Sequence, residues 1–595
     1  MKTYSSRKDV PEKYKWDLSD FYKNDEEYFK SFEETKKNVE KLKDFVGCTK
    51  DSKRLCEFLK TDREVENEVE NLYVYAYVKD DEELGKAENI DRKNKATILF
   101  SEYATSTSFF EPELIELSKD DYDKLFDNKD LDEFKFLLDE LYKNKEHTLS
   151  EREEIIINQL VTAMNNYEDI SSNLLNSEND YGKVIIDGED TIITSTNYSK
   201  LLKNKDQKIR KEVFKKYKDV LAMHASTSAS LLDSYVKANN TDSKIHNYKD
   251  AWDSKLFNNH MSQKAYDALV STVENNVDKL QKYYKLYKDT LGLKELHQYD
   301  LNLDLTSSDR KYTIEEANDL VREVVKPLGE EYVKAYNKII DNHYIDYCEY
   351  KGKCSGGYSA STIDHDSRIL LSFNEDLDSV SIIAHECGHN VHHQFIQKNN
   401  SKQYRDVSTL VSEVTSLTNE CLLSNYLAKN GKTKEERLSG ISNIMDVFIS
   451  NLFGAVREGK MERDFYDYSL EGNAITKDYM NELDLNSLKK YYGNEVIIDE
   501  NGNTGWIRRS HYFCNYYLFD YSFCISVASA NVAKILSGDK KALDNYIKFI
   551  SLGSDIHPIE AFKVLGFDLE DKRVYEDAIK YFDSLIDEFN KISKE

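Results

Sequence analysis

Two histidines four residues apart, His385 and His389, constrain the fold more than any other feature of the sequence. They enclose Glu386 in an H-E-x-x-H pentapeptide that follows the largely apolar residues 380–384. Residues four apart lie on one face of an α-helix, so a helix lets both imidazoles converge on one point. The pattern therefore predicts a helix whose two imidazoles can bind one metal ion, with Glu386 beside it.

The scarcity of helix breakers extends the helical prediction to the rest of the chain. Of 595 residues, 4 are Pro and 21 are Gly. Glu, Lys, Leu and Asp are abundant, which favours long helices. Segments with strand character are short, and one of them, Arg368–Phe373, directly precedes the motif helix. We therefore predict a mainly α fold with a small β-sheet near the metal site.

Two changes in the pattern divide the chain. Residues 182–193 contain two β-branched runs around a Gly-containing turn, which is typical of a β-hairpin. Residues 355–359 predict a second turn, ahead of the strand. We take the hairpin as the end of an N-terminal helical region, residues 1–197, followed by a metal-binding region, residues 198–595.

The limits of several helices can also be predicted. The polar residues 13–20, followed by aromatic residues at helical intervals, predict the start of the first helix. Helical pattern resumes at Tyr198, with breaks expected near Gly292 and Pro327. The last 20 residues predict a charged amphipathic helix.

Charge and cysteine usage exclude several classes of function. The formal net charge is -27, and no basic stripe stands clear of interleaved acids, which argues against a nucleic-acid binder. The start is polar and unlike a signal peptide, and no window approaches the roughly 18 consecutive apolar residues of a membrane span. The eight cysteines are scattered without repeated short spacing, which favours free thiols in a reducing compartment. We expect a cytoplasmic protein that binds neither nucleic acid nor membrane.

The third metal ligand decides the class of site, because zinc in a hydrolytic site usually has three protein ligands. A class with a third histidine needs Gly at 392 and His at 395, but the chain has His392 and Phe395. A thermolysin-like class would place a glutamate near residues 408–409, which are Ser and Thr. The next candidate is Glu413, in an apolar setting where a carboxylate is costly unless paired or metal-bound. Helical spacing places Glu420 on the same face. The alternative is an amphipathic helix with two exposed acids.

Three further positions can be interpreted. Glu386 would take a proton from a zinc-bound water and pass it to a leaving amine. Cys387 points away from the face of the two histidines, so we expect a buried thiol. His511 lies in the aromatic segment 506–521, and a histidine with tyrosine hydroxyls can donate to the negative charge that amide hydrolysis develops on oxygen. Core packing is the alternative for this segment.

These patterns together resemble the oligoendopeptidase F branch of the thimet-oligopeptidase-like zinc metallopeptidases. Residues 351–359, Lys-Gly-Lys-Cys-Ser-Gly-Gly-Tyr-Ser, are similar to the Gly-rich turn ahead of that family's motif helix. Residues 412–420 follow its A-E-x-x-S-x-x-N-E segment, and Trp506-x-Arg508-x-x-His511 resembles its C-terminal substrate-binding segment. The resemblance also includes residues 10–18, so it spans nearly the whole chain.

The resemblance implies a large helical zincin-type body, split by a deep substrate channel with zinc on its floor. It implies one Zn²⁺ per chain, with His385, His389 and Glu413 as ligands and Glu386 as a catalytic residue. The Gly-rich turn and the strand Ile369–Phe373 would line the cleft, where a substrate can add as an extended strand.

The resemblance also implies that His511 and tyrosines stabilise the tetrahedral intermediate. Tyr516, Tyr517 and Tyr521 all stay candidates, because Phe-Asp at residues 519–520 stands where the family tends to have Tyr-Gln. The implied substrate-binding residues are Gly356, Gly357, Tyr358, Arg508 and Tyr521.

The leading hypothesis is a zinc-dependent endopeptidase that hydrolyses internal bonds of short unfolded oligopeptides. A zinc carboxypeptidase or dipeptidase on the same scaffold is one alternative. A non-catalytic peptide-binding metalloprotein is the other. Short peptides are the expected partners, and the sequence leaves open whether the chain is a monomer or a dimer.

Overall fold

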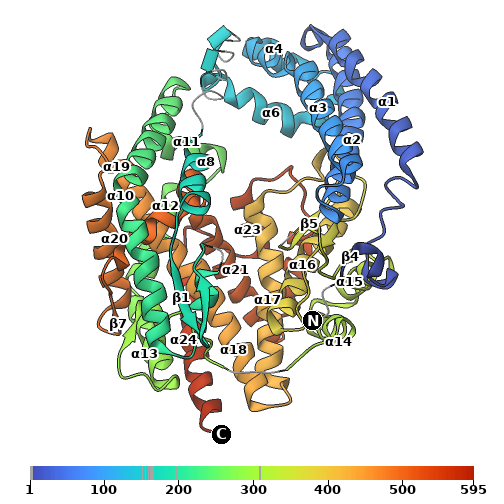
Figure 1. Cartoon of the computed structure of the whole chain (residues 1–595). Coiled ribbons are helices and arrows are strands. Elements are labelled where there is room, and N and C mark those ends of the chain that lie inside the picture. Colours follow the sequence, from blue (N-terminus) through green and yellow to red (C-terminus); the bar gives the residue numbers. More distant parts are fainter. Residues whose placement is uncertain are drawn as a thin grey trace. The chain divides into compact units, whose positions relative to one another are not determined.

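The computed structural model describes residues 4–150, 152–153, 156–157, 160, 166–195, 197–306, 310–354 and 356–595. Long helices dominate these residues and the strands are few and short, which confirms the predicted mainly α fold (Figure 1). Ser355 lies outside the described residues, so the turn predicted at residues 355–359 can be followed only from Gly356 onward.

Contacts between residues group the chain into two compact units, each built from three separated stretches. Unit 1 comprises Met1–Glu151, Arg310–Leu423 and Asn531–Gly566. Unit 2 comprises Arg152–Asp309, Ser424–Ala530 and Phe567–Glu595. The division falls inside two helices, α17 (Thr409–Asn430) and α21 (Leu518–Leu536).

Unit 1 contains the N-terminal helices and the predicted metal-binding helix. In Figure 1 the first three helices lie side by side, in blue. Their buried apolar side chains form one core, to which Leu370 also belongs. Besides its part of α17 and α21, the helices of this unit are α1 (Asp25–Leu42), α2 (Ser52–Glu82), α3 (Ala87–Thr107), α4 (Phe110–Glu116), α5 (Lys119–Leu125), α6 (Lys135–Lys143), α14 (Ile314–Val324), α15 (Glu330–Asp341), α16 (Leu377–Asn399), α22 (Lys540–Phe549) and α23 (Pro558–Leu565).

A three-stranded sheet in unit 1 supports the motif helix. Its strands are β4 (Ile345–Asp346), β5 (Tyr358–Ala360) and β6 (Arg368–Leu370), in the order β4-β6-β5. The pair β4–β6 is parallel and the pair β5–β6 is antiparallel. The buried Asn390 on α16 donates from Nδ2 to the carbonyl oxygen of Ser367 over 2.7 Å, which ties the helix to the start of β6. The predicted small sheet beside the motif helix is therefore present.

Unit 2 is a helical body with two small two-stranded sheets. Its helices, besides its part of α17 and α21, are α8 (Tyr167–Ser172), α9 (Tyr198–Leu201), α10 (Gln207–Ile245), α11 (Ala251–Asn258), α12 (Gln263–Glu274), α13 (Val277–Thr290), α18 (Lys434–Phe448), α19 (Ala455–Leu470), α20 (Lys477–Tyr492) and α24 (Lys572–Ser593). Strands β3 (Leu296–His297) and β7 (Val496–Ile497) pair in parallel.

The predicted hairpin is present in unit 2. Strands β1 (Lys183–Ile186) and β2 (Glu189–Ile192) are antiparallel. The two residues between them, Asp187 and Gly188, have φ of 53° and 86°. Positive φ at both turn residues matches the twist of the flanking strands, which explains why the short turn needs glycine.

The helix limits differ from the predictions at one place. The first helix was expected to start after residues 13–20, but α1 begins at Asp25. Asn24 accepts a hydrogen bond from the amide of Glu27 over 2.9 Å, and the Glu27 carboxylate accepts one from the amide of Lys23 over 2.8 Å. This reciprocal cap fixes the start more strongly than the aromatic spacing does.

The other predicted limits are confirmed. Helix α13 ends at Thr290, before Gly292, and Pro327 lies in a short 3-10 helix between α14 and α15. The C-terminal residues form α24. Across the part of the chain that the structure describes, no helix is both long and apolar enough to cross a membrane.

Candidate functional site

The backbones of α16 and α17 approach each other closely at Gly388. A Cβ atom at this position would lie 2.8 Å from Ser416 Cα and 2.9 Å from the Thr415 carbonyl oxygen. Such distances are too short for any side chain, so only glycine allows this approach. A hydrogen bond supports it, because Asn419 Nδ2 donates to the carbonyl oxygen of Ala384 over 2.9 Å.

The approach brings three potential metal ligands together within unit 1. The ligand atoms of His385, His389 and Glu413 all lie within 4.8 Å of one another. The two Nε2 atoms are 3.3 Å apart, and the Glu413 carboxylate oxygens lie 3.6 Å from His385 Nε2 and 3.8 Å from His389 Nε2. Two imidazole nitrogens facing one carboxylate form a donor set that suits zinc.

Partial exposure distinguishes this group from a closed structural metal site. The side chains of His385, His389 and Glu413 are 27%, 20% and 20% exposed. Structural zinc sites use four protein ligands and are closed, whereas catalytic sites keep a position open for water or substrate. The three side chains therefore fit a catalytic metal centre with one side accessible.

A second carboxylate orients the first histidine. Glu420 Oε1 lies 2.6 Å from His385 Nδ1, and Ser381 Oγ donates to Glu420 Oε2 over 3.3 Å. A carboxylate can only accept, so Nδ1 carries the proton and Nε2 turns its lone pair toward His389 and Glu413. This arrangement fixes the tautomer that a metal ligand needs.

The electrostatic field at His385 favours positive charge. Burial lowers the pKa of His385. The hydrogen bond to Glu420 and the charges of Glu420, Glu413 and Glu386 raise it by more than burial lowers it, so that the pKa is about 9. The same carboxylates would attract a divalent cation to the facing Nε2 atoms.

His389 is held neutral. Burial and the neighbouring His385 and His392 lower the pKa of His389 well below its usual range. Burial likewise lowers the pKa of His392 to about 3. A neutral imidazole is the form that binds a metal, so His389 is ready to act as a ligand at neutral pH.

Glu386 lies on α16 between the two histidines and is 8% exposed. Burial raises its pKa to about 7, and Glu413 and Glu420 raise it while His385 lowers it. The Gly-rich turn is next to it, because a Cβ on Gly357 would lie 3.8 Å from Glu386 Oε1. The structure thus brings the predicted Gly357 to the predicted Glu386.

The neighbouring Gly356 and Tyr358 take different positions. Gly356 has φ of 104°, a conformation that favours glycine, and a Cβ there would meet nothing within 4 Å. The hydroxyl of Tyr358 donates to Asp81 Oδ2 over 2.7 Å, so its side chain anchors β5 to α2.

The sheet limits which strand can pair with a substrate. The strand Ile369–Phe373 was expected to line, with the Gly-rich turn, a cleft where a substrate adds as an extended strand, and this stays a prediction. Ile369 is opposite Ile345 in β4 and opposite Ser359 in β5, so both of its edges are occupied. Strand β5 is an outer strand of this sheet, because the strand order is β4-β6-β5.

The C-terminal segment gathers three of its predicted residues within unit 2. His511 lies in a short 3-10 helix, Ser510–Phe513. Its ring stacks against that of Tyr517, with centroids 6.0 Å apart. The hydroxyl of Tyr521 donates to that of Tyr517 over 3.4 Å. Burial and the charge of Arg509 lower the pKa of His511.

Two other predicted residues lie apart from this group. Tyr516 is 1% exposed, and its ring packs against Trp252 and Tyr466 with centroids 4.8 Å and 4.6 Å away. The Arg508 guanidinium lies about 5 Å from the rings of Tyr198 and Tyr217, at 5.1 Å and 5.0 Å. The structure therefore places Tyr517 next to His511 and Tyr521 next to Tyr517, whereas Tyr516 packs in the core.

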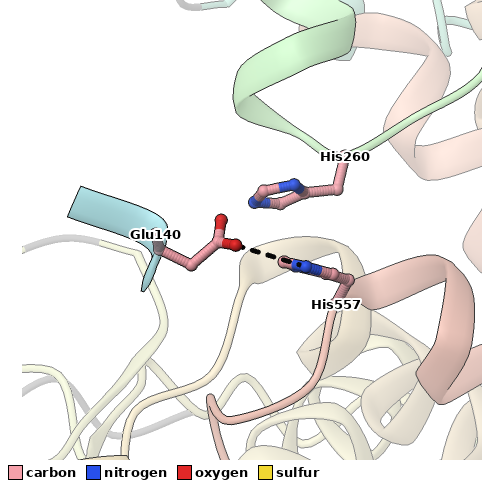
Figure 2. A group of neighbouring side chains, drawn as sticks. All are labelled: Glu140, His260 and His557. Carbon is pink, nitrogen blue, oxygen red and sulfur yellow. Dashed lines mark ion pairs between the residues drawn. The ribbon is translucent and has the colours of Figure 1, made fainter. Parts of the chain in front are cut away.

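A histidine outside the motif also pairs with an acid in unit 1. His557 Nε2 lies 3.4 Å from Glu140 Oε1 (Figure 2). His260, which Figure 2 also labels, belongs to unit 2. The pair offers two ligands, one fewer than the three that a catalytic zinc site uses.

Sequence reasoning missed three residues that build the centre. Gly388 was treated as a variable position of the motif, although a glycine inside a helix signals a close approach. Glu420 was placed on the ligand face without a role, and its link to His385 depends on the packing of two helices. Asn419 gave no signal, because its partner is a backbone carbonyl. The expected burial of Cys387 is confirmed, since it is 0% exposed.

Comparisons with known proteins identify the family of the chain. The family model described as Peptidase family M3 matches residues 200–581, and the model described as Oligopeptidase F matches residues 113–181. Oligopeptidase PepF of Bacillus subtilis is 29% identical over 98% of this chain and 88% of its own length. Group B oligopeptidase PepB of Streptococcus agalactiae is 28% identical over 99% of this chain and 98% of its own.

Two solved structures are similar to this chain over nearly its whole length. A peptidase from Chlamydophila abortus has a TM-score of 0.90 at 25% identity and covers 99% of this chain and 100% of its own. The oligoendopeptidase-F from Enterococcus faecium has a TM-score of 0.74 at 26% identity and covers 96% of this chain and 99% of its own.

The close approach at Gly388 can be tested by substitution. In Gly388→Ala the new methyl group would overlap the α17 backbone, so α17 must move and separate Glu413 from the histidines. We expect a loss of stability on the order of 1–3 kcal/mol and a zinc affinity lower by about 10-fold or more. Thermal unfolding and competition with a chelating dye measure the two effects.

Gly459→Ala is the matched control. Gly459 is also inside a helix, but its Cβ would meet nothing closer than 3.8 Å. It should leave zinc affinity unchanged. Equal zinc affinities for the wild type and Gly388→Ala would show that the approach does not hold the ligands together.

Proposed function

The chain belongs to peptidase family M3, and from this premise we propose that it is a zinc-dependent endopeptidase that hydrolyses internal bonds of short unfolded oligopeptides. The observation that carries the proposal is the position of Glu386 between two histidines whose Nε2 atoms face Glu413. The relatives described as oligopeptidases support the substrate class.

We propose that His385 and His389, through Nε2, and Glu413, through its carboxylate, hold one zinc ion per chain. Zinc, when bound there, supplies a Lewis acid that polarises the substrate carbonyl and lowers the pKa of a water molecule. Glu420 keeps His385 in the ligating tautomer through its contact with Nδ1.

Glu386 is the proposed general base and acid. Its carboxylate takes a proton from the attacking water, and the same group delivers that proton to the leaving amine. Burial raises the pKa of Glu386 to about 7, which suits a group that must both accept and release a proton near neutral pH. Gly357 lies next to Oε1, so the Gly-rich turn is proposed to lie beside the reacting peptide bond.

His511 and Tyr517 are the proposed donors to the oxyanion. Hydrolysis places negative charge on the carbonyl oxygen, and an imidazole N–H and a phenol O–H can donate to it. The stacking of His511 on Tyr517 supports the choice of this tyrosine, and the contact of Tyr521 with its hydroxyl supports an accessory role. Tyr516 stays a prediction with less support, because its side chain is buried in the core.

Substrate binding is proposed to use the outer strand β5. A peptide in extended conformation can pair with the free edge of a sheet through its backbone. Gly356 and Gly357 precede this strand and present little bulk. Arg508 and Tyr521 stay proposed contacts for the peptide in unit 2, on the strength of the family resemblance.

Three further predictions stay proposals. The division of the chain at residues 197 and 198 is supported by the hairpin and by the limits of the two family matches. A cytoplasmic location rests on the scattered cysteines. The deep substrate channel rests on the family resemblance.

Replacement of Glu386 by Gln tests the mechanism. Glu386→Gln keeps the size of the side chain but removes its basicity, so kcat for an internally quenched peptide should fall by about 100-fold to 10,000-fold. Zinc content should stay at one ion per chain. The same substitution at the exposed Glu482 should leave kcat unchanged. Turnover at the wild-type rate by Glu386→Gln would rule out the proposed base.

End-blocked peptides separate the endopeptidase from its alternatives. A peptide acetylated at its amino end and amidated at its carboxyl end should be cut at internal bonds as fast as the free peptide, and a chelator should stop the cleavage. Mass spectrometry of the products identifies the bonds. Cleavage restricted to free carboxyl ends would instead indicate a carboxypeptidase, and tight zinc binding without products would indicate a binding protein.

A further inference from the structure

The segment that joins His511 to Tyr517 contains an unfavourable backbone bend. Asn515 and Tyr516 are consecutive residues with φ of 34° and 58°. Asparagine tolerates this left-handed region, but a tyrosine rarely adopts it. Such a conformation persists only where the surrounding structure holds it in place.

Two side chains from different helices hold this bend. Glu462 on α19 accepts a hydrogen bond at Oε1 from the backbone amide of Tyr516 over 2.7 Å. The hydroxyl of Tyr235 on α10 accepts one from the amide of Asn515 over 3.2 Å. Each left-handed residue therefore has its own buried acceptor, and both acceptors belong to unit 2.

The carboxyl group of Glu462 has a high desolvation cost at this position. It is 0% exposed, and its Oε2 is buried with no hydrogen-bond partner among the described residues. Burial, together with the charge of Asp520, raises the pKa of Glu462 to about 8. The hydrogen bond from the Tyr516 amide and the charge of Lys255 lower this pKa, but by less. An apolar side chain would fill the same space without this desolvation cost. What an apolar side chain could not supply is the acceptor for the Tyr516 amide.

The bend determines where Tyr517 lies. Tyr517 follows the two left-handed residues directly, and α21 begins one residue later, at Leu518. Tyr516 turns into the core against Trp252, whereas Tyr517 stacks on His511. Since neighbouring side chains point in different directions, a change of φ at Tyr516 would move the Tyr517 hydroxyl away from its present position.

We infer that Glu462 is a positioning residue for peptide hydrolysis, which holds the Asn515–Tyr516 bend and thereby sets Tyr517 beside His511. This inference rests on the proposed function, in which His511 and Tyr517 donate to the oxyanion. Glu462 acts through the backbone of Tyr516, whose amide donates to its Oε1.

The test compares four variants of the zinc-loaded full chain on one internally quenched peptide: Glu462→Ala, Glu462→Gln, Tyr517→Phe and the double variant Glu462→Ala/Tyr517→Phe. Glu462→Ala should lower kcat by about 10-fold to 100-fold, because a misplaced donor loses most of its effect. KM should stay within about threefold, since substrate contacts are unchanged. Glu462→Gln keeps an acceptor oxygen and should recover activity to within about threefold of the wild type.

The double variant distinguishes positioning from a general loss of structure. If Glu462 acts through Tyr517, Glu462→Ala should have no further effect once the Tyr517 hydroxyl is gone, so the double variant should be as fast as Tyr517→Phe. Multiplied effects in the double variant, or wild-type kcat in Glu462→Ala, would overturn the inference. Glu471→Ala, at an exposed acid after the end of the same helix, should behave like the wild type.

A variant that fails to fold does not end the test. If Glu462→Ala lacks a cooperative thermal transition, Tyr235→Phe replaces it, because it removes the hydroxyl that accepts from the Asn515 amide, together with its contact to the Asn239 side chain. It should lower kcat and show the same lack of additivity with Tyr517→Phe, and wild-type kcat would overturn the inference.

Failure of the premise gives a different result. If the wild type cleaves no peptide, the proposed function is wrong and the inference falls with it. If the wild type cleaves and Tyr517→Phe is as fast, the role of Tyr517 is wrong. When the wild type is active and Tyr517→Phe is slow, a fast Glu462→Ala or multiplied effects in the double variant overturn the inference alone.

Discussion

The passage of the α17 backbone across Gly388 is the constraint on which the candidate metal centre depends. Because no side chain fits between Gly388 and Ser416, the two helices can meet closely enough for Glu413 to face both histidines of α16. Asn419 ties α17 to the carbonyl of Ala384 at the same level, and Tyr332 donates to Asn419 Oδ1 over 2.9 Å. The ligands therefore owe their geometry to residues that bind no metal.

Buried acids orient functional groups in both units of the molecule. In unit 1, Glu420 fixes the orientation of the His385 ring through its contact with Nδ1. In unit 2, Glu462 holds the amide of Tyr516 and with it the direction of Tyr517. Both positions bear the cost of removing a carboxyl group from water, which a chain selected for stability alone would avoid. Their common use is to restrict a neighbouring group to one orientation.

The candidate metal ligands could be chosen from the sequence because their spacing is a local property of helices. His385 and His389 share a helical face by their separation of four residues, and Glu413 and Glu420 by their separation of seven. The mainly α fold followed from the same kind of reasoning, since the helix breakers are few. The hairpin followed from a short turn with a glycine.

The remainder of the site depends on features that periodicity does not contain. The left-handed bend at Asn515 and Tyr516 decides which tyrosine lies next to His511. This pair of residue types does not predict two consecutive left-handed residues. The pairing of Ile369 on both edges depends on strand order, which places β5 outermost. The narrow contact at Gly388 depends on a helix more than twenty residues further along the chain. Such features require the tertiary structure.

X-ray absorption at the zinc edge of the purified, zinc-loaded chain tests the central claim most directly. The account predicts one zinc ion per chain, with first-shell nitrogen and oxygen at about 2.0–2.2 Å and the outer-ring signature of two imidazoles. Sulfur scattering at about 2.3 Å, or a shell with fewer than two imidazoles, would contradict a centre built from His385, His389 and Glu413.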